Sequence, residues 1–128
     1  MNIRRARLLA ASIVVTFVAI RLMLYSSPDS DFDIAGYNIH HLFTGLLLIV
    51  GGGIPLALFP APSRLMDAAA VVFGIGLSLA LDEWVYLIAT DGSNASYLLP
   101  VSLRGGVVMV ALAVIYIGVL YIVSGKRR

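Results

Sequence analysis

Four long apolar stretches constrain what this chain can fold into more than any other feature. They cover residues about 7–25, 36–59, 65–89 and 97–123 of the 128. A helix of roughly 20 apolar residues crosses a hydrocarbon core about 30 Å thick. With 60% hydrophobic residues, 12% charged residues and a mean hydropathy of +0.97, the composition lies outside the range of soluble domains. We therefore expect an all-α integral membrane protein, a four-helix transmembrane bundle forming one domain over residues 1–128.

The basic residues predict the orientation of this bundle. Seven of the nine Lys and Arg lie in the two terminal tails or in the connection after the second stretch: Arg4, Arg5, Arg7, Arg64, Lys126, Arg127 and Arg128. The other two connections carry Asp29, Asp31, Asp33 and Asp91 instead. By the positive-inside rule we expect a multi-pass protein of the cell membrane with both termini in the cytoplasm. These basic segments favour contact with anionic membrane lipid, and no nucleic-acid partner is expected.

Polar residues interrupt all four apolar stretches. They are Arg21 in the first, His40 and His41 in the second, Asp82 and Glu83 in the third, and Arg104 in the fourth. At 1.5 Å per residue from the helix ends, all six are expected roughly 6 to 11 Å below the outer boundary. A charge at the bilayer centre costs on the order of 3 kcal/mol, so intramembrane charges need partners and mark candidate functional sites. We expect one polar layer in which the two arginines balance the two carboxylates.

The third stretch is predicted to be the central helix of the bundle. Gly74, Gly76, Ser78 and Ala80 recur at helical spacing ahead of the two carboxylates. Small residues at such spacing allow membrane helices to approach closely. We therefore expect protein, rather than lipid, around much of this helix.

Two imidazoles and two carboxylates at one depth are a ligand set that suits a divalent metal such as zinc, iron or manganese. His40, His41, Asp82 and Glu83 are accordingly predicted metal ligands. Arg21 and Arg104 are predicted to bind an anionic ligand, such as a lipid phosphate, through bidentate hydrogen bonds. The metal prediction depends on shared depth alone, because neither the His pair nor the Asp-Glu pair has the i, i+3 or i, i+4 spacing of known ligand motifs.

Two other interpretations stay open at this stage. One is that the charges form a structural ion-pair network in an accessory subunit of a larger membrane complex or in a homo-oligomer. Alternatively, Asp, Glu and His side chains inside a membrane form the relays of proton and ion transporters. No catalytic residue is assigned, since the chain has no Cys and no GxSxG nucleophile motif.

Overall fold

The computed structural model describes residues 1–28, 33–34, 37–59 and 61–126. In chain order the elements are α1 (Ile3–Ser26), β1 (Asp33–Ile34), β2 (Tyr37–Asn38), α2 (His41–Leu58), α3 (Arg64–Ala89), α4 (Asn94–Tyr97) and α5 (Pro100–Lys126). The four long helices α1, α2, α3 and α5 are each long and apolar enough to cross a membrane. The predicted all-helical architecture with four such helices is confirmed, apart from the antiparallel β1–β2 pair of two residues per strand.

Local capping explains where the helices begin. The Asn2 side chain accepts a hydrogen bond from the Arg5 amide at 3.1 Å, and the Ser63 hydroxyl accepts one from the Met66 amide at 3.2 Å. Such caps satisfy amides that have no partner within the first turn of a helix. Helix α5 begins at Pro100, a residue that tolerates the first helical position because it lacks an amide proton.

Two helix starts differ from the sequence prediction in a way that affects the candidate site. Helix α2 begins at His41 rather than near residue 36, because the chain before it forms the β1–β2 pair. His40 is therefore the N-cap of α2 and His41 is its first residue, so neither lies one turn inside the helix. Helix α5 begins at Pro100 rather than near residue 97, because residues 94–97 form the separate turn α4.

Helix α3 is the centre of the bundle, as predicted. It packs against α1, α2 and α5. Half of the residues in its most apolar 18-residue segment are buried, whereas 11% are buried in the corresponding segment of each of the other three helices. Glycines allow the close approach of α2: a Cβ on Gly45 would lie 2.6 Å from the Gly76 carbonyl oxygen. On the α1 side, the buried Ser78 hydroxyl donates a hydrogen bond to the Ile13 carbonyl at 2.8 Å. The small residues of α3 thus fix its distance to two neighbours.

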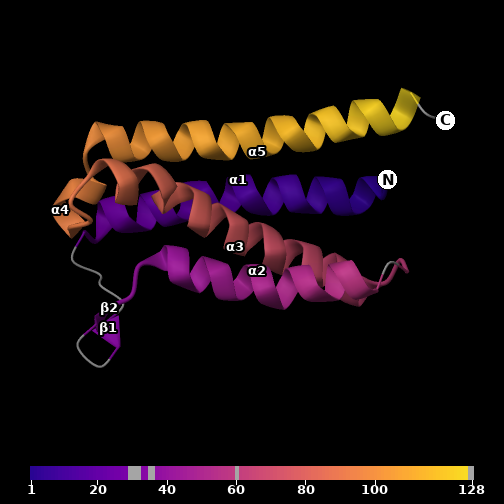
Figure 1. Ribbon diagram of the computed structural model, residues 1–128, viewed down its shortest axis with the longest axis horizontal. Coiled ribbons are helices and arrows are strands. Elements are labelled where there is room, and N and C mark those ends of the chain that lie inside the picture. The colour runs from indigo at the N-terminus through magenta and orange to yellow at the C-terminus, as the bar shows by residue number, and fades with distance from the viewer. Residues whose placement is uncertain (29–32, 35–36, 60, 127–128) are drawn as a thin grey trace.

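Both ends of the described chain lie at the same end of the bundle (Figure 1). The start of α1, the end of α5 and the connection between α2 and α3 lie at one end, whereas α4 and the β1–β2 pair lie at the other. This arrangement agrees with an even number of membrane crossings. Asp29, Asp31, Arg127 and Arg128, on which part of the orientation prediction depends, lie outside the described residues.

Candidate functional site

A group of polar side chains lies inside the bundle at the end that carries α4. We call it the polar cluster, and its members are Arg21, His40, His41, Asp82, Glu83, Tyr97 and Ser102. The two carboxylates are buried, with 0% of Asp82 and 3% of Glu83 exposed. Five of the six residues predicted to share one layer therefore come together.

An ion pair between α1 and α3 forms the buried part of the polar cluster. The Asp82 Oδ1 atom lies 2.7 Å from the Arg21 Nε atom and 2.6 Å from its Nη2 atom. The Arg21 Nη2 atom also donates to the carbonyl and hydroxyl oxygens of Ser102, both at 3.1 Å, and its Nη1 atom donates to the Tyr97 carbonyl at 3.5 Å. The guanidinium thus connects α1 to α3, α4 and α5.

Aromatic rings and a glycine enclose this ion pair. The Arg21 guanidinium carbon lies 4.2 Å from the centre of the Tyr97 ring and 5.8 Å from that of Phe17, both within cation–π range. A Cβ on Gly106 would lie 2.7 Å from Asp82 Oδ1 and 3.1 Å from Arg21 Nη2. Glycine at position 106 therefore lets the backbone of α5 reach the ion pair.

The two histidines contact both carboxylates from the start of α2. The His41 Nε2 atom lies 2.9 Å from Asp82 Oδ2, and its Nδ1 atom lies 3.4 Å from Glu83 Oε1. The His40 Nδ1 atom lies 3.2 Å from the same Glu83 oxygen. The histidine side chains are 22% (His40) and 17% (His41) exposed, so they lie between the buried carboxylates and the surface at this end.

Glu83 also caps helix α2 from the neighbouring helix. Its Oε2 atom accepts a hydrogen bond from the Leu42 amide at 2.7 Å, whereas His40, at the cap position itself, makes no side-chain cap bond. A carboxylate at a helix N-terminus satisfies a free amide and interacts favourably with the helix dipole. This contact gives an acidic residue inside the membrane region a structural role.

Tyr97 is a member of the polar cluster that the sequence analysis missed. Its hydroxyl donates a short hydrogen bond to Asp82 Oδ2, and its ring meets the His41 ring edge-on at 5.6 Å between centroids. Burial, followed by the neighbouring Asp82 charge, raises the pKa of the Tyr97 phenol well above its usual value. The phenol therefore keeps its proton and stays a donor to Asp82. The available signal was a tyrosine at the outer end of the fourth apolar stretch, whose long side chain can reach inward toward the carboxylates.

Arg104 does not belong to the polar cluster, contrary to the prediction. It is exposed, and no carboxylate oxygen among the described residues lies within 4.0 Å of it. Successive helical residues point about 100° apart, so Arg104 lies about 200° around α5 from both Ser102 and Gly106, which face the polar cluster. The predicted balance of two arginines against two carboxylates is therefore wrong, and among the residues that the structure describes Arg21 is the one that contributes a fixed positive charge to the polar cluster.

The four predicted metal ligands are neighbours, but their arrangement is one of mutual hydrogen bonds. The described residues include no group of three or more His, Cys, Asp or Glu side chains that could hold a metal ion. Each histidine has a ring nitrogen 2.9 or 3.2 Å from a carboxylate oxygen. The geometry therefore gives no support to metal binding, which stays a prediction.

Comparisons with protein-family models, with curated proteins and with solved structures found no match to this chain. Its function is therefore inferred from the geometry of the polar cluster.

Proposed function

We propose that this chain is a small structural or accessory protein of the cell membrane, in which the polar cluster locks the helices in register. One observation carries the proposal: the buried polar atoms of the cluster have their hydrogen-bond partners within the chain. Among the described residues, the buried side-chain nitrogen or oxygen without a hydrogen-bond partner is Nε of Arg5, which lies outside the polar cluster. A site built to bind a ligand would instead offer donors or acceptors that the protein leaves free.

The physics of a membrane favours such a lock. Lipid tails are as apolar as the helix surfaces, so packing and hydrogen bonds between helices, rather than the hydrophobic effect, determine how they associate. Sliding or rotation of one helix would separate the partners in the polar cluster and leave a buried charge unpaired. Such a charge costs several kcal/mol, so the cluster opposes these movements. The single side chain of Asp82 contacts side chains of three other helices, α1, α2 and α4.

The positive and negative charges of the polar cluster would balance if one histidine were protonated on both ring nitrogens. Arg21 contributes one positive charge against the two negative charges of Asp82 and Glu83. His41 has the more extensive contacts of the two histidines, because both of its ring nitrogens face carboxylate oxygens, at 2.9 and 3.4 Å.

The proposal includes the predicted orientation, with both termini and the α2–α3 connection in the cytoplasm. The basic residues Arg4, Arg5, Arg7 and Arg64 lie at the end of the bundle where α1 begins, which supports this orientation by the positive-inside rule. The polar cluster then faces the outside of the cell.

Three measurements on the purified protein separate the proposal from its competitors. A structural lock predicts little bound zinc, iron or manganese by mass spectrometry after metal is added back. It also predicts proton flux into liposomes no faster than through protein-free liposomes, and a large loss of stability when the charge of Arg21 or Asp82 is removed. Near-stoichiometric metal that is lost in a folded His40→Ala/His41→Ala variant would contradict the proposal in favour of a metal site. Flux above the protein-free level would favour a transporter.

A further inference from the structure

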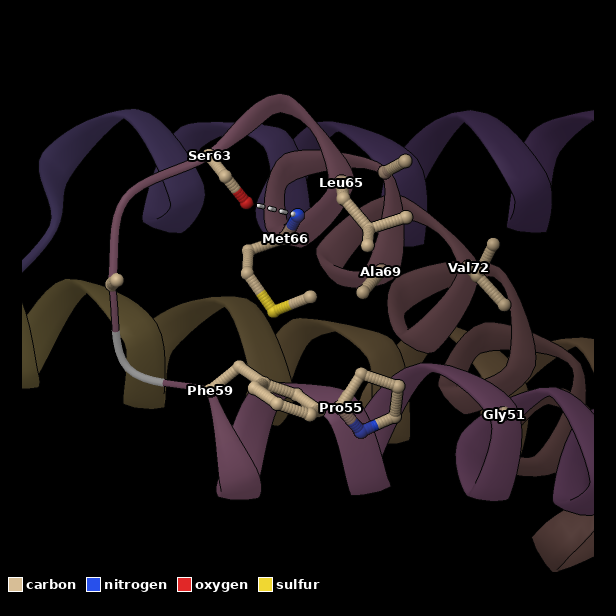
Figure 2. Close-up of a pocket in the computed structure, with 10 residues that line it drawn as sticks. Gly51, Pro55, Phe59, Ser63, Leu65, Met66, Ala69 and Val72 are labelled. Carbon is tan, nitrogen blue, oxygen red and sulfur yellow. Dashed lines mark hydrogen bonds between the residues drawn. The ribbon is translucent and has the colours of Figure 1, made fainter.

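A groove between α2 and α3 opens at the end of the bundle opposite to the polar cluster. Its volume is about 550 Å³, which lies within the roughly 300–1,000 Å³ typical of small-molecule sites. Figure 2 shows the residues along its two sides: Gly51 and Pro55 of α2 with Phe59 directly after it, and Leu65, Ala69 and Val72 of α3. The groove is therefore lined mainly by apolar groups.

The groove has open space at Gly51 of α2, a residue without a side chain. A Cβ added at Gly51 would meet no atom within 4 Å. Toward the mouth of the groove, Phe59 is 59% exposed and Leu65 is 72% exposed. In a membrane, an apolar opening of this kind faces hydrocarbon chains and not water.

Basic side chains flank the polar end of the groove. Arg64 is exposed and lies between two lining residues, Ser63 and Leu65. Arg5 reaches across from α1, where its Nη2 atom donates a hydrogen bond to the carbonyl of the lining residue Ala61 at 2.8 Å. The Nε atom of Arg5 has no hydrogen-bond partner but lies 3.6 Å from Asp67 Oδ1, and this carboxylate also pairs with Arg4 at 3.0 Å. Basic side chains outnumber that carboxylate at this end, and Arg64 is not among its partners, so the mouth of this apolar groove keeps a net positive charge.

We propose that this groove binds one acyl chain of an anionic phospholipid, whose phosphate group is bound by Arg64. A guanidinium group binds phosphate through paired hydrogen bonds, and basic pockets at membrane boundaries select anionic head groups. The depth of the groove suits such a lipid. Gly51 lies seven residues before Leu58, where α2 ends, so the groove reaches about 10 Å inward from the charged end. The part of an acyl chain nearest the head group fits that depth, while the head group stays at the boundary and the rest of the chain continues into the membrane.

The test is a lipid titration of the full chain in detergent, followed by native mass spectrometry, with phosphatidylglycerol and phosphatidylcholine as probes. We expect Gly51→Leu to weaken binding of phosphatidylglycerol at least about tenfold, because the new side chain fills space otherwise available to more than two methylene groups. Its matched control is Gly118→Leu on α5, where a Cβ likewise meets nothing within 4 Å and where no change is expected. Both variants replace a helical glycine, so a general effect on folding would appear in both.

The charge is tested separately. Arg64→Gln should weaken phosphatidylglycerol binding about fivefold, the effect of removing one basic residue from a lipid site, and should reduce the preference over phosphatidylcholine. Arg7→Gln, a change at another exposed arginine near the same end, should alter binding less than twofold. Glycerophosphate, which has the phosphate but no acyl chain, should not compete for the site.

Two outcomes would overturn the proposal. Unchanged phosphatidylglycerol binding by a folded Gly51→Leu variant would show that the acyl chain does not occupy the groove. A mass corresponding to two chains, lost in Gly51→Leu and kept in Gly118→Leu, would assign the groove to a second copy of the protein.

Discussion

Replacing Asp82 with asparagine tests the proposed lock most directly. The change keeps the size of the side chain but removes the charge that faces Arg21, a residue only 4% exposed. Arg21 would then face neutral acceptors, the oxygens of Ser102, the Tyr97 carbonyl and the new amide oxygen. The amide group would also turn its own donor toward the Tyr97 hydroxyl or toward the guanidinium. Because breaking a buried ion pair leaves an uncompensated charge, we expect a loss of about 3–5 kcal/mol in the free energy of unfolding.

The matched comparison is Glu83→Gln at the adjacent position. Glutamine keeps an oxygen that can accept the Leu42 amide, and Glu83 has no arginine partner. The remaining charges, Arg21 and Asp82, would then be equal without a proton on either histidine. We therefore expect a loss of no more than about 1.5 kcal/mol, the size of one ordinary hydrogen bond. Arg104→Gln, at an exposed position outside the polar cluster, should change stability by less than about 0.5 kcal/mol.

These values are measured by unfolding the purified variants in mixed detergent micelles with increasing SDS, followed by circular dichroism. The reasoning is refuted if Asp82→Asn costs less than about 1 kcal/mol, since such a value fits an exposed ion pair. It is also refuted if Glu83→Gln costs as much as Asp82→Asn, because the two carboxylates would then not have the different roles described above. A further check is Arg21→Leu combined with Asp82→Leu, which should recover much of the loss because neither charge remains buried.

Three further predictions concern packing, the polar cluster and orientation. Gly76→Ala places a Cβ 2.5 Å from the Gly45 carbonyl oxygen and should cost about 1–3 kcal/mol in the same assay, whereas Gly118→Ala, with open space around it, should not destabilise the protein. Tyr97→Phe removes the hydroxyl that donates to Asp82 and should cost about 1–3 kcal/mol in the same assay, with the ring contact to Arg21 retained. Because the chain has no Cys, a single Ala95→Cys change should react with a membrane-impermeant maleimide on intact cells, whereas Gly125→Cys should react only after lysis; the reverse pattern would invert the proposed orientation.

The helices and the central position of α3 could be predicted because they follow from patterns local to the sequence. Long apolar stretches define membrane-spanning helices, and the spacing of Gly74, Gly76 and Ser78 marks a helix that packs against neighbours on several sides. Counting residues from the helix ends also placed His40 and His41 level with the two carboxylates. That estimate succeeded although α2 begins five residues later than predicted, because the histidines still lie at the end of the helix that faces Asp82 and Glu83.

Arg104 was assigned wrongly because depth gives the position of a residue along a helix and not around it. Ser102 and Gly106 face the polar cluster, while Arg104 lies on the other side of the same turn of α5. Apolar residues surround Arg104 in sequence, so no amphipathic pattern indicated which face it occupies. The cap that Glu83 provides to Leu42 could not be predicted from the sequence either, because it joins residues 41 positions apart through tertiary structure.

The adjacency of Asp82 and Glu83 explains how one helix can hold two others. A metal site on a single helix needs ligands three or four residues apart, so that both point in one direction. Neighbouring residues point about 100° apart instead. On the central helix α3 this angle directs Asp82 toward Arg21 of α1 and Glu83 toward the first turn of α2. His41 reaches both carboxylates from that first turn and connects the two contacts. The spacing that makes an Asp-Glu pair a weak metal motif therefore makes it a suitable connection among three helices.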